Sequence, residues 1–312
     1  MELHQIGKTQ LIQLKNIEMK DNKLFAKCEF QNPTGSHKDR TFLHIIETLE
    51  NEGVIKPGMI LVDCSTGNGG AALAWIGKEK GYRIKIFMPE GMTQERINQI
   101  KKFGGDLIET PKETFLNGSV EAAKNFTENN KDAYYLNQAE TRLNMEAWFE
   151  CGKEIVEELK VKGIKPDYFV CSIGTGGTFS GIATILKKTY PKLKTIGIEV
   201  DKSAPIYSKK KGLNFEHKSH NLMGLGAGVL SDNTELSLID EIEVVDGNEA
   251  WERMKKFINS GGMGIGPTCG ANLLMSEKLM EKVESKAIVT VFFDSAWKYH
   301  SRWNGIYPEY NK

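Results

Sequence analysis

The sequence of 312 residues has no excess of charge of one sign and no long apolar run. Its 41 Lys and Arg side chains balance 41 Asp and Glu side chains, so no overall field draws the protein to nucleic acid or to an anionic membrane. No apolar run reaches membrane-spanning length, and the first residues lack the apolar stretch and cleavage site of a signal peptide. These absences predict a cytoplasmic protein that binds neither nucleic acid nor membrane.

Cysteine is also scarce, and its spacing argues against a disulfide framework or a zinc ribbon, because the cysteines are odd in number and contain no CxxC pair. The five are Cys28, Cys64, Cys151, Cys171 and Cys269. His217 and His220 have the spacing H-x-x-H, but no nearby acidic or cysteine cluster completes a ligand set. The sequence therefore predicts a reducing compartment and no metal site.

Short apolar runs alternate with amphipathic stretches along most of the chain. This rhythm begins with Met59–Cys64, pauses over a polar connection at about Glu128–Arg142, and closes with Ala287–Asp294. Alternation of this kind is typical of a parallel sheet covered by helices. We therefore expect two α/β units, with a long glycine-rich loop at Ala204–Ser231 that is functional or mobile.

Glycine, by contrast, is frequent, and it gathers in four segments where predicted strands give way to helices. These segments are Asn32–Arg40, Ser65–Gly70, Gly174–Gly181 and Gly266–Asn272. One such loop in an α/β protein is commonly just a tight turn. Four of them, all rich in small polar residues, indicate one site built from several strand ends.

The segment Gly174–Gly181 follows an apolar run and opens a predicted helix, so its backbone N–H groups can converge on an anion. It does not match the dinucleotide pattern GxGxxG, because Phe179 stands where the last glycine belongs, and GxxxxGK[ST] occurs nowhere in the sequence. These features disfavour a nucleotide fold and favour a small phosphorylated cofactor. The alternative is that the loop merely begins a helix.

Lys38 follows Pro-Thr-Gly-Ser-His and precedes an amphipathic run, so it lies at or near a predicted helix start. The positive end of the helix dipole favours the neutral amine there, and a partly desolvated neutral lysine is suited to form a Schiff base with a carbonyl. The alternative is a solvated turn lysine. His37, its neighbour, is at most part of a pocket wall.

These segments, in this order, resemble fold-type II pyridoxal-phosphate enzymes, most closely the cysteine synthase and cystathionine β-synthase branch. The resemblance runs from IGKTQLIQL near the start to FFDSAWKYHSRW near the end. It implies two three-layer α/β domains with mostly parallel twisted sheets, as in the tryptophan synthase β-like fold, and pyridoxal 5'-phosphate in the cleft between them. The expected limits are 36–146 for a smaller N-terminal domain and 1–35 with 147–312 for a larger cofactor-binding domain. A homodimer is also implied.

The resemblance also assigns roles to individual residues. Lys38 holds the cofactor as an internal aldimine and then acts as general base, while Asn68 hydrogen-bonds the 3-hydroxyl. Thr268 places its hydroxyl against the pyridine nitrogen, with Cys269 as the less favoured neighbour. The phosphate lies in a cradle formed by Gly174, Thr175, Gly176, Gly177 and Thr178. The substrate's α-carboxylate is bound by Ser65, Thr66, Gly69 and Gln138.

Two positions depart from the pattern usual in cysteine synthases. Gly69 replaces a threonine of the substrate loop, and Ala139 replaces an aromatic residue after the glutamine. These changes predict an acceptor pocket larger than sulfide requires. The alternative is compensation, in which Trp75, Trp148 or another aromatic side chain fills the space.

The resemblance implies β-elimination and β-replacement on an activated serine, either O-acetylserine or O-phosphoserine, through an aminoacrylate intermediate. The partners are then a small amino-acid substrate and a nucleophile. NPTGSHKDR and STGN also resemble the threonine synthase branch, so a γ-replacement of that type is one alternative. A serine or threonine ammonia-lyase is another, and a degenerate binding protein on the same fold is the alternative that is not an enzyme.

Overall fold

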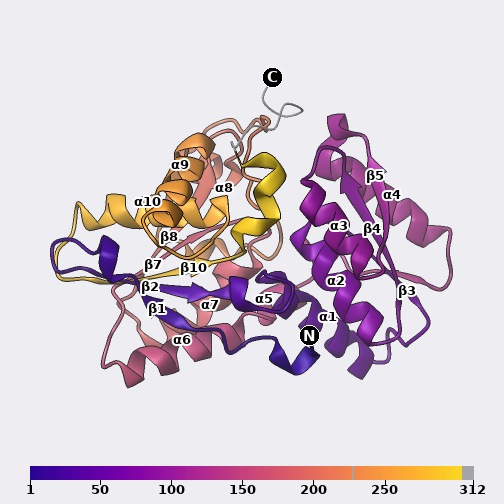
Figure 1. The fold of residues 1–312 in the computed structure, drawn as a ribbon, viewed down its shortest axis with the longest axis horizontal. Helices are drawn as coiled ribbons and strands as arrows, with labels where there is room; N and C mark the ends of the chain where they lie inside the picture. Colours follow the sequence, from indigo (N-terminus) through magenta and orange to yellow (C-terminus); the bar gives the residue numbers. More distant parts are fainter. Residues whose placement is uncertain (227, 304–312) are drawn as a thin grey trace.

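The computed structural model describes residues 1–226 and 228–303. Figure 1 shows two lobes side by side, each built around one sheet. The six-stranded sheet has the order β1-β2-β10-β7-β8-β9, and the four-stranded sheet has the order β5-β4-β3-β6. Among the described helices, none is both long enough and apolar enough to cross a membrane.

The four-stranded sheet is parallel throughout. Its strands are β3 (Ile60–Cys64), β4 (Arg83–Pro89), β5 (Asp106–Thr110) and β6 (Ala133–Tyr135). The helices between these strands are α2 (Asn68–Glu79), α3 (Gln94–Lys102) and α4 (Phe115–Glu128). Two more helices, α1 (Lys38–Asn51) and α5 (Leu143–Glu146), flank this lobe, and α1 packs against α2 and α5.

The six-stranded sheet is parallel except for the pairing of β1 with β2. Its strands are β1 (Leu11–Gln13), β2 (Lys23–Cys28), β7 (Tyr168–Ser172), β8 (Lys194–Val200), β9 (Glu241–Val245) and β10 (Ala287–Phe292). Its helices are α6 (Phe149–Val161), α7 (Gly177–Thr189), α8 (Pro205–Lys211), α9 (Gly247–Asn259) and α10 (Pro267–Met280). The short 3-10 turns are η1 (Leu3–Gln5), η2 (Lys15–Ile17), η3 (Glu29–Gln31), η4 (Lys112–Thr114), η5 (Leu236–Leu238) and η6 (Ala296–Arg302).

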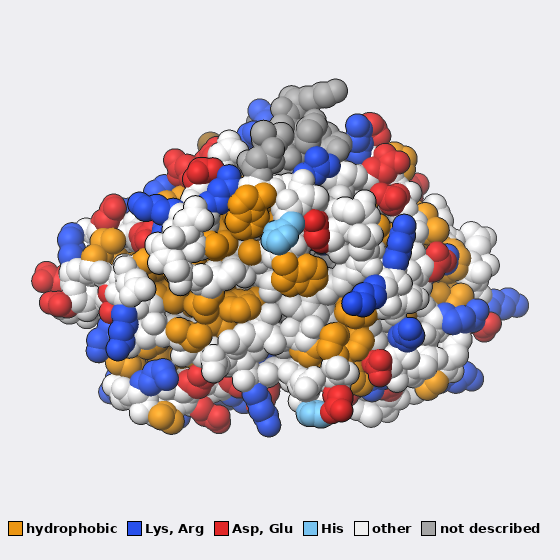
Figure 2. All heavy atoms as spheres, in the orientation of Figure 1, with side chains coloured by type: hydrophobic (Ala, Val, Ile, Leu, Met, Phe, Trp, Pro, Cys, Tyr) orange, Lys and Arg blue, Asp and Glu red, His pale blue; other side chains and the backbone are white. Residues whose placement is uncertain are grey.

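Burial explains why the central strands read as apolar runs rather than as alternating patterns. All six residues of β10 are buried, because helices cover both faces of a parallel sheet. Figure 2 shows that positive and negative side chains mix around the edge of one face of the molecule, while apolar side chains gather over its middle. The alternating rhythm of the sequence thus corresponds to two covered parallel sheets.

Two predicted loops contain regular structure that the sequence did not reveal. The polar connection at Glu128–Arg142 holds β6, an edge strand of three residues that pairs with β3. The glycine-rich stretch Ala204–Ser231 holds α8. Prediction of these two segments as unbroken loops was wrong, because elements this short carry too few residues to show a period.

Candidate active site

A cavity of about 340 Å³ is lined by residues that follow strands of both sheets. Its wall includes all the predicted site residues except Gly177. The contributing segments follow β3, β6, β7 and β10 and include the beginnings of α1 and α10. Ligands of open parallel sheets bind at the carboxyl ends of the strands, where these segments lie. The four glycine-rich segments therefore meet at one cavity, as the sequence predicted.

Lys38 is the first residue of α1, as predicted, and its side chain lines the cavity. Its Nζ donates a hydrogen bond to Oε1 of Gln138 at 2.7 Å. Burial lowers the pKa of Lys38 to about 8, although the nearby Asp63 carboxylate acts in the opposite direction. Near that pH a large fraction of the amine is neutral, which is the form that condenses with a carbonyl.

The segment after β3 turns sharply into α2. Gly67 has a φ of +141°, and a Cβ there would lie only 2.3 Å from the Arg96 side chain, so glycine is required. The hydroxyl of Ser65 accepts from the N–H of Gly67 at 3.0 Å, and Thr66 donates to the carbonyl of Met223 at 2.8 Å. This turn brings small polar groups to the cavity wall.

Gln138 links the cavity lysine to this turn. Its amide Nε2 donates to the carbonyl of Cys64 at 3.2 Å, while its Oε1 accepts from Lys38. A Cβ on Gly69 would lie 2.8 Å from that Nε2 and 3.0 Å from the Ser65 hydroxyl. The space that a threonine side chain would need at Gly69 is therefore taken by Gln138 and Ser65.

The predicted phosphate loop connects β7 to α7. Gly176 has a φ of +80° and precedes the first helical residue, Gly177. A Cβ at Gly176 would overlap Thr234, and one at Gly177 would overlap the side chain of Asn144. Free N–H groups at a helix start bind anions, and this helix start lies at the cavity wall. The loop residues on the wall are Gly174, Thr175, Gly176 and Thr178.

Thr268 and Cys269 lie in the first turn of α10 but face different surroundings. Thr268 lines the cavity, and its buried hydroxyl has no hydrogen-bond partner in the described part of the chain. The Cys269 sulfur accepts from the N–H of Phe293 at 3.1 Å and lies 3.9 Å from the carbonyl of Asp294. Thr268 is thus the neighbour with a group available to a ligand.

The cavity wall also fits pyridoxal 5'-phosphate in the polar groups that it leaves unsatisfied. Oδ1 of Asn68 and Oγ1 of Thr268 are buried without partners among the described residues. A buried polar group left unpaired costs about 1–3 kcal/mol, so a ligand that pairs with both would be stabilised there. A ring with polar substituents, a carbonyl for Lys38 and a phosphate for the α7 start matches this set of groups.

The three histidines considered in the sequence lie in different surroundings. His37 lines the cavity and packs against Trp148 and Phe293, and burial lowers its pKa well below the usual value. His217 and His220 do not line this cavity, and each is held by a local contact: His217 to the Ser203 hydroxyl and His220 to the carbonyl of Gly226. Neither histidine of this pair takes part in a metal cluster found among the described residues.

Three residues of the site escaped the sequence analysis. Asp63 stands inside an apolar strand, and Asp294 is the first polar residue after the apolar run of β10, so both carried a weak signal. No sequence pattern pointed to Asn144. Its amide donates to the carbonyl of Gln138 at 2.6 Å and to the Thr175 hydroxyl at 3.1 Å, which joins two parts of the wall.

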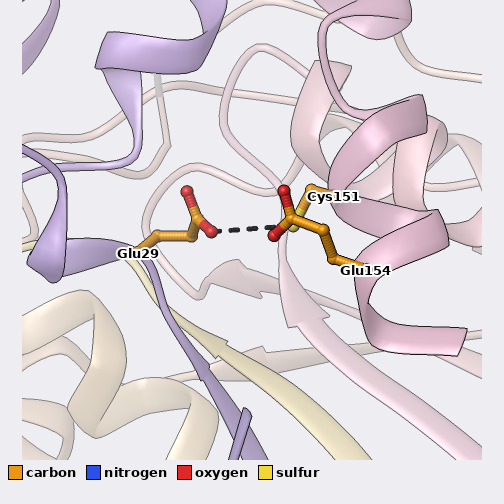
Figure 3. Close-up of side chains that lie close together, drawn as sticks. All are labelled: Glu29, Cys151 and Glu154. Carbon is orange, nitrogen blue, oxygen red and sulfur yellow. Dashed lines mark hydrogen bonds between the residues drawn. The ribbon is translucent and has the colours of Figure 1, made fainter. Parts of the chain in front are cut away.

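Outside the cavity, one group of described side chains has the spacing of metal ligands (Figure 3). Glu29 comes from η3, and Cys151 and Glu154 come from α6, with the Cys151 sulfur 3.6 Å from a Glu29 oxygen. Arg40 forms hydrogen bonds to both carboxylates at 2.7–2.9 Å. The two carboxylates are already neutralised, so we interpret the group as an ion-pair cluster.

Comparison with known proteins identifies the class to which this site belongs. The family model described as "Pyridoxal-phosphate dependent enzyme" matches residues 3–294, and the chain belongs to that family. It is therefore an enzyme that uses pyridoxal 5'-phosphate.

Within this family, the chain is similar to enzymes named for reactions that form cysteine or O-ureido-L-serine. The chain is 35% identical over 301 residues to a cysteine synthase of Staphylococcus aureus, covering 95% of this chain and 94% of that relative. The solved cysteine synthase of Entamoeba histolytica is 30% identical and superposes with a TM-score of 0.87, over 96% of this chain and 88% of that one. A solved O-ureido-L-serine synthase is 26% identical with a TM-score of 0.88, over 96% and 92%.

Proposed function

We propose that the enzyme replaces the β-substituent of an activated serine by a nucleophile, as a cysteine synthase does. The observation that carries the proposal is the Lys38 amine, which is buried at a helix start beside Gln138 and has a pKa lowered to about 8. The likeness to cysteine synthases over 95% of the chain supports the same reaction type.

The chain's residues would divide the work of holding the cofactor. Lys38 would attach to its carbonyl, Asn68 would bond the ring hydroxyl, and Thr268 would face the ring nitrogen. The N–H groups at the start of α7 would hold the phosphate. Gly177, the first residue of α7, would contribute its N–H although it does not line the cavity. When bound, the cofactor withdraws electrons from the substrate's α-carbon. The phosphate contacts would come from Gly174, Thr175, Gly176, Gly177 and Thr178.

The substrate's carboxylate would be bound by groups close to the lysine. Gln138 and the turn after β3 present hydroxyl, amide and backbone N–H donors there, and the Lys38 amine lies within hydrogen-bond reach of Gln138. Once released, that amine would take the α-proton as general base, a role worth about 10²–10⁴-fold in rate. Thr268 presents a hydroxyl rather than a carboxylate, so it would not hold a proton on the ring nitrogen, which favours loss of a β-substituent. The carboxylate-binding groups would be Ser65, Thr66, Gly69 and Gln138.

The charges on the wall favour O-acetylserine over O-phosphoserine. Lys38 is the one lysine or arginine among the described lining residues, and His37 is held neutral by burial. Glu140 and Asp232 add negative charge to the same wall, and Asp294, also on it, is paired with Arg96. A phosphate leaving group would meet no cation beyond the lysine that the chemistry uses, whereas an acetyl ester needs none.

The cavity wall at Ala139 would leave room for a nucleophile larger than sulfide. Ala139 lines the cavity, and neither Trp75 nor Trp148 does, so these two aromatic side chains do not fill the space. Phe115, Phe179 and Phe293 do line it, so compensation by another aromatic side chain is the alternative. We propose that small thiols or amines compete with sulfide at this side of the cavity.

One experiment tests the reaction and separates its alternatives. Purified holoenzyme is mixed with O-acetylserine or O-phosphoserine, with and without sulfide and small thiols, while cofactor absorbance and amino-acid products are followed. Cysteine formation from O-acetylserine supports the proposal. Pyruvate or 2-oxobutyrate formed from serine or threonine without an acceptor would identify an ammonia-lyase instead. Phosphate released from O-phosphohomoserine would identify a threonine synthase type, and binding without turnover a degenerate protein.

We also propose that the protein is a cytoplasmic homodimer with domains at 36–146 and at 1–35 plus 147–312, of which residues 304–312 lie outside the described part. All five cysteines are free, which supports a reducing compartment. The four-stranded sheet draws its strands from 60–135, which supports the domain limits. Light scattering tests the dimer, and limited proteolysis tests the limits.

A further inference from the structure

Asp294 is a buried carboxylate at the cavity wall with no role assigned so far. It follows the end of β10 and is 2% exposed. Its Oδ2 accepts hydrogen bonds from Asn68 Nδ2 at 2.6 Å and from the Tyr299 hydroxyl at 2.7 Å, and Arg96 Nη2 lies 3.4 Å away. Its Oδ1 has no partner among the described residues. Water is displaced from this carboxylate, so its protein contacts decide its orientation.

The backbone around Asp294 reaches two further site segments. Its carbonyl accepts from the N–H of Gly266, two residues before Thr268, at 2.9 Å. The N–H of Ser295 donates to the carbonyl of Gly35 at 3.1 Å, three residues before Lys38. A Cβ on Gly266 would lie 2.1 Å from Asp294 Oδ1, so the approach is as close as glycine permits. One short segment therefore contacts three of the four glycine-rich loops.

Arg96 extends these contacts across the cleft. It belongs to α3 of the lobe with the four-stranded sheet, and its Nη1 donates to the carbonyl of Thr66 at 3.0 Å. Its Nη2 contacts Tyr299 and Asp294, which follow β10 of the other sheet. Asp294 thus joins the two lobes at the point where Asn68 meets the cavity.

The chemistry of an amide explains what the carboxylate can do. An asparagine amide can rotate by half a turn, which exchanges its NH₂ group with its carbonyl oxygen. An ionised carboxylate accepts hydrogen bonds and donates none, so it pairs with the NH₂ group of Asn68 alone. The second N–H and Oδ1 of Asn68 are then held in one orientation toward the cavity.

We propose that Asp294 is a positioning residue that fixes the orientation of the Asn68 amide toward the cofactor. The inference rests on the proposed contact of Asn68 with the cofactor's ring hydroxyl. Without the carboxylate, the amide would populate both rotations, whereas the backbone contacts to the lysine loop and the Thr268 loop would remain. Asp294 itself touches none of the reacting atoms in this proposal.

The test compares Asp294→Asn with Tyr299→Phe as the matched control, because both remove a hydrogen-bond group from the same contact. Apoprotein is titrated with pyridoxal 5'-phosphate by fluorescence, and the visible spectrum and urea unfolding of each variant are recorded. We expect Asp294→Asn to raise the dissociation constant roughly tenfold or more and to shift the visible absorption maximum. Tyr299→Phe is expected to leave both close to wild type, whatever it does to unfolding.

A double-variant cycle shows whether Asp294 acts through Asn68. If it does, Asn68→Ala with Asp294→Asn binds the cofactor no more weakly than Asn68→Ala alone. Additive losses would overturn the inference, as would an unchanged spectrum and dissociation constant in Asp294→Asn, or equal shifts in Tyr299→Phe. An Asn68→Ala variant that binds cofactor as wild type does would instead refute the proposed role of Asn68.

Discussion

Two regions of this protein bury similar charged and polar side chains, but one region pairs them and the other leaves several unpaired. The paired cluster consists of Lys27, Glu29, Arg40, Glu154 and Glu158. Arg40 forms paired contacts with Glu29 and Glu154, and Lys27 contacts Glu154 and Glu158 at 2.8 Å. Burial alone would raise the pKa of Glu154, but Arg40 and Lys27 lower it to about 2.

The cavity wall, which includes Lys38 only two residues before Arg40, leaves several polar groups unpaired. Asn68 Oδ1, Thr268 Oγ1 and Asp294 Oδ1 are buried without partners among the described residues. Lys38 has one hydrogen bond and a lowered pKa. Burial also acts to lower the pKa of Lys27, but Cys151 and the neighbouring carboxylates Glu154 and Glu158 raise it overall. The contrast teaches that complete pairing serves stability, while unpaired buried groups on a cavity wall remain available to a ligand.

The largest effect is expected from Lys38→Ala. Removing the amine removes the attachment point of the cofactor and the general base, so turnover should fall by about 10²–10⁴-fold or more. Far-ultraviolet circular dichroism should stay unchanged, because the lysine is not part of the paired cluster. Borohydride reduction of the wild-type enzyme followed by peptide mass spectrometry should place the label on Lys38. A label on Lys298 or Lys27, which are also buried, would show that the assignment is wrong.

Glu29→Gln should do the opposite of Lys38→Ala: it should lower stability and leave the bound cofactor unaffected. It leaves Arg40 with an unpaired share of its charge in a buried place, and breaking a buried pair costs about 3–5 kcal/mol. The free energy of unfolding, measured with urea, should fall by roughly that amount, while the visible spectrum of the bound cofactor stays as in the wild type. Exposed Glu252, which pairs with Lys255, provides the control: Glu252→Gln should change stability by less than about 1 kcal/mol. A changed cofactor spectrum in Glu29→Gln would show that the paired cluster also affects the cofactor site, which contradicts the comparison.

Thr268→Asp should alter chemistry more than stability. A carboxylate facing the ring nitrogen would hold a proton there through a charged hydrogen bond, typically worth about 1.5–3 kcal/mol, and elimination should slow. Steady-state turnover with O-acetylserine and the cofactor spectrum measure the effect. Cys269→Ser is the control, since the sulfur already contacts the Phe293 N–H behind the wall. Wild-type turnover and spectrum in Thr268→Asp would mean that this hydroxyl does not face the ring nitrogen.

The smallest effect is expected from Asp63→Asn. The Asp63 carboxylate raises the pKa of Lys38 against the larger effect of burial, so its removal should lower that pKa further below about 8. Neutral amine is the reactive form, and its fraction grows as pH rises through the pKa. The rate of cofactor capture by apoprotein, measured against pH, should therefore reach its midpoint at a lower pH in the variant. An unchanged midpoint, or one moved upward, would contradict the assigned influence of Asp63.

Much of the site could be predicted from the sequence because its signals are local. A lysine at a helix start and a glycine loop between an apolar strand and a helix are properties of neighbouring residues, and the structure places Lys38 and Gly174–Gly181 accordingly. The packing around Gly69 could not be predicted from local signals. Its glycine suggested a lost hydroxyl, but the structure shows that Gln138, 69 positions later in the chain, occupies the space.

The sequence by itself determined where the longer strands and helices and the glycine turns form, since apolar runs, turn residues and helix starts act over a few residues. Only the tertiary structure decided which groups meet. It turned Thr268 to the cavity and Cys269 behind it, and it brought Asp294 to Asn68 across 226 positions of the chain. Such contacts depend on how two sheets pack together, and no local pattern of residues encodes the distance between them.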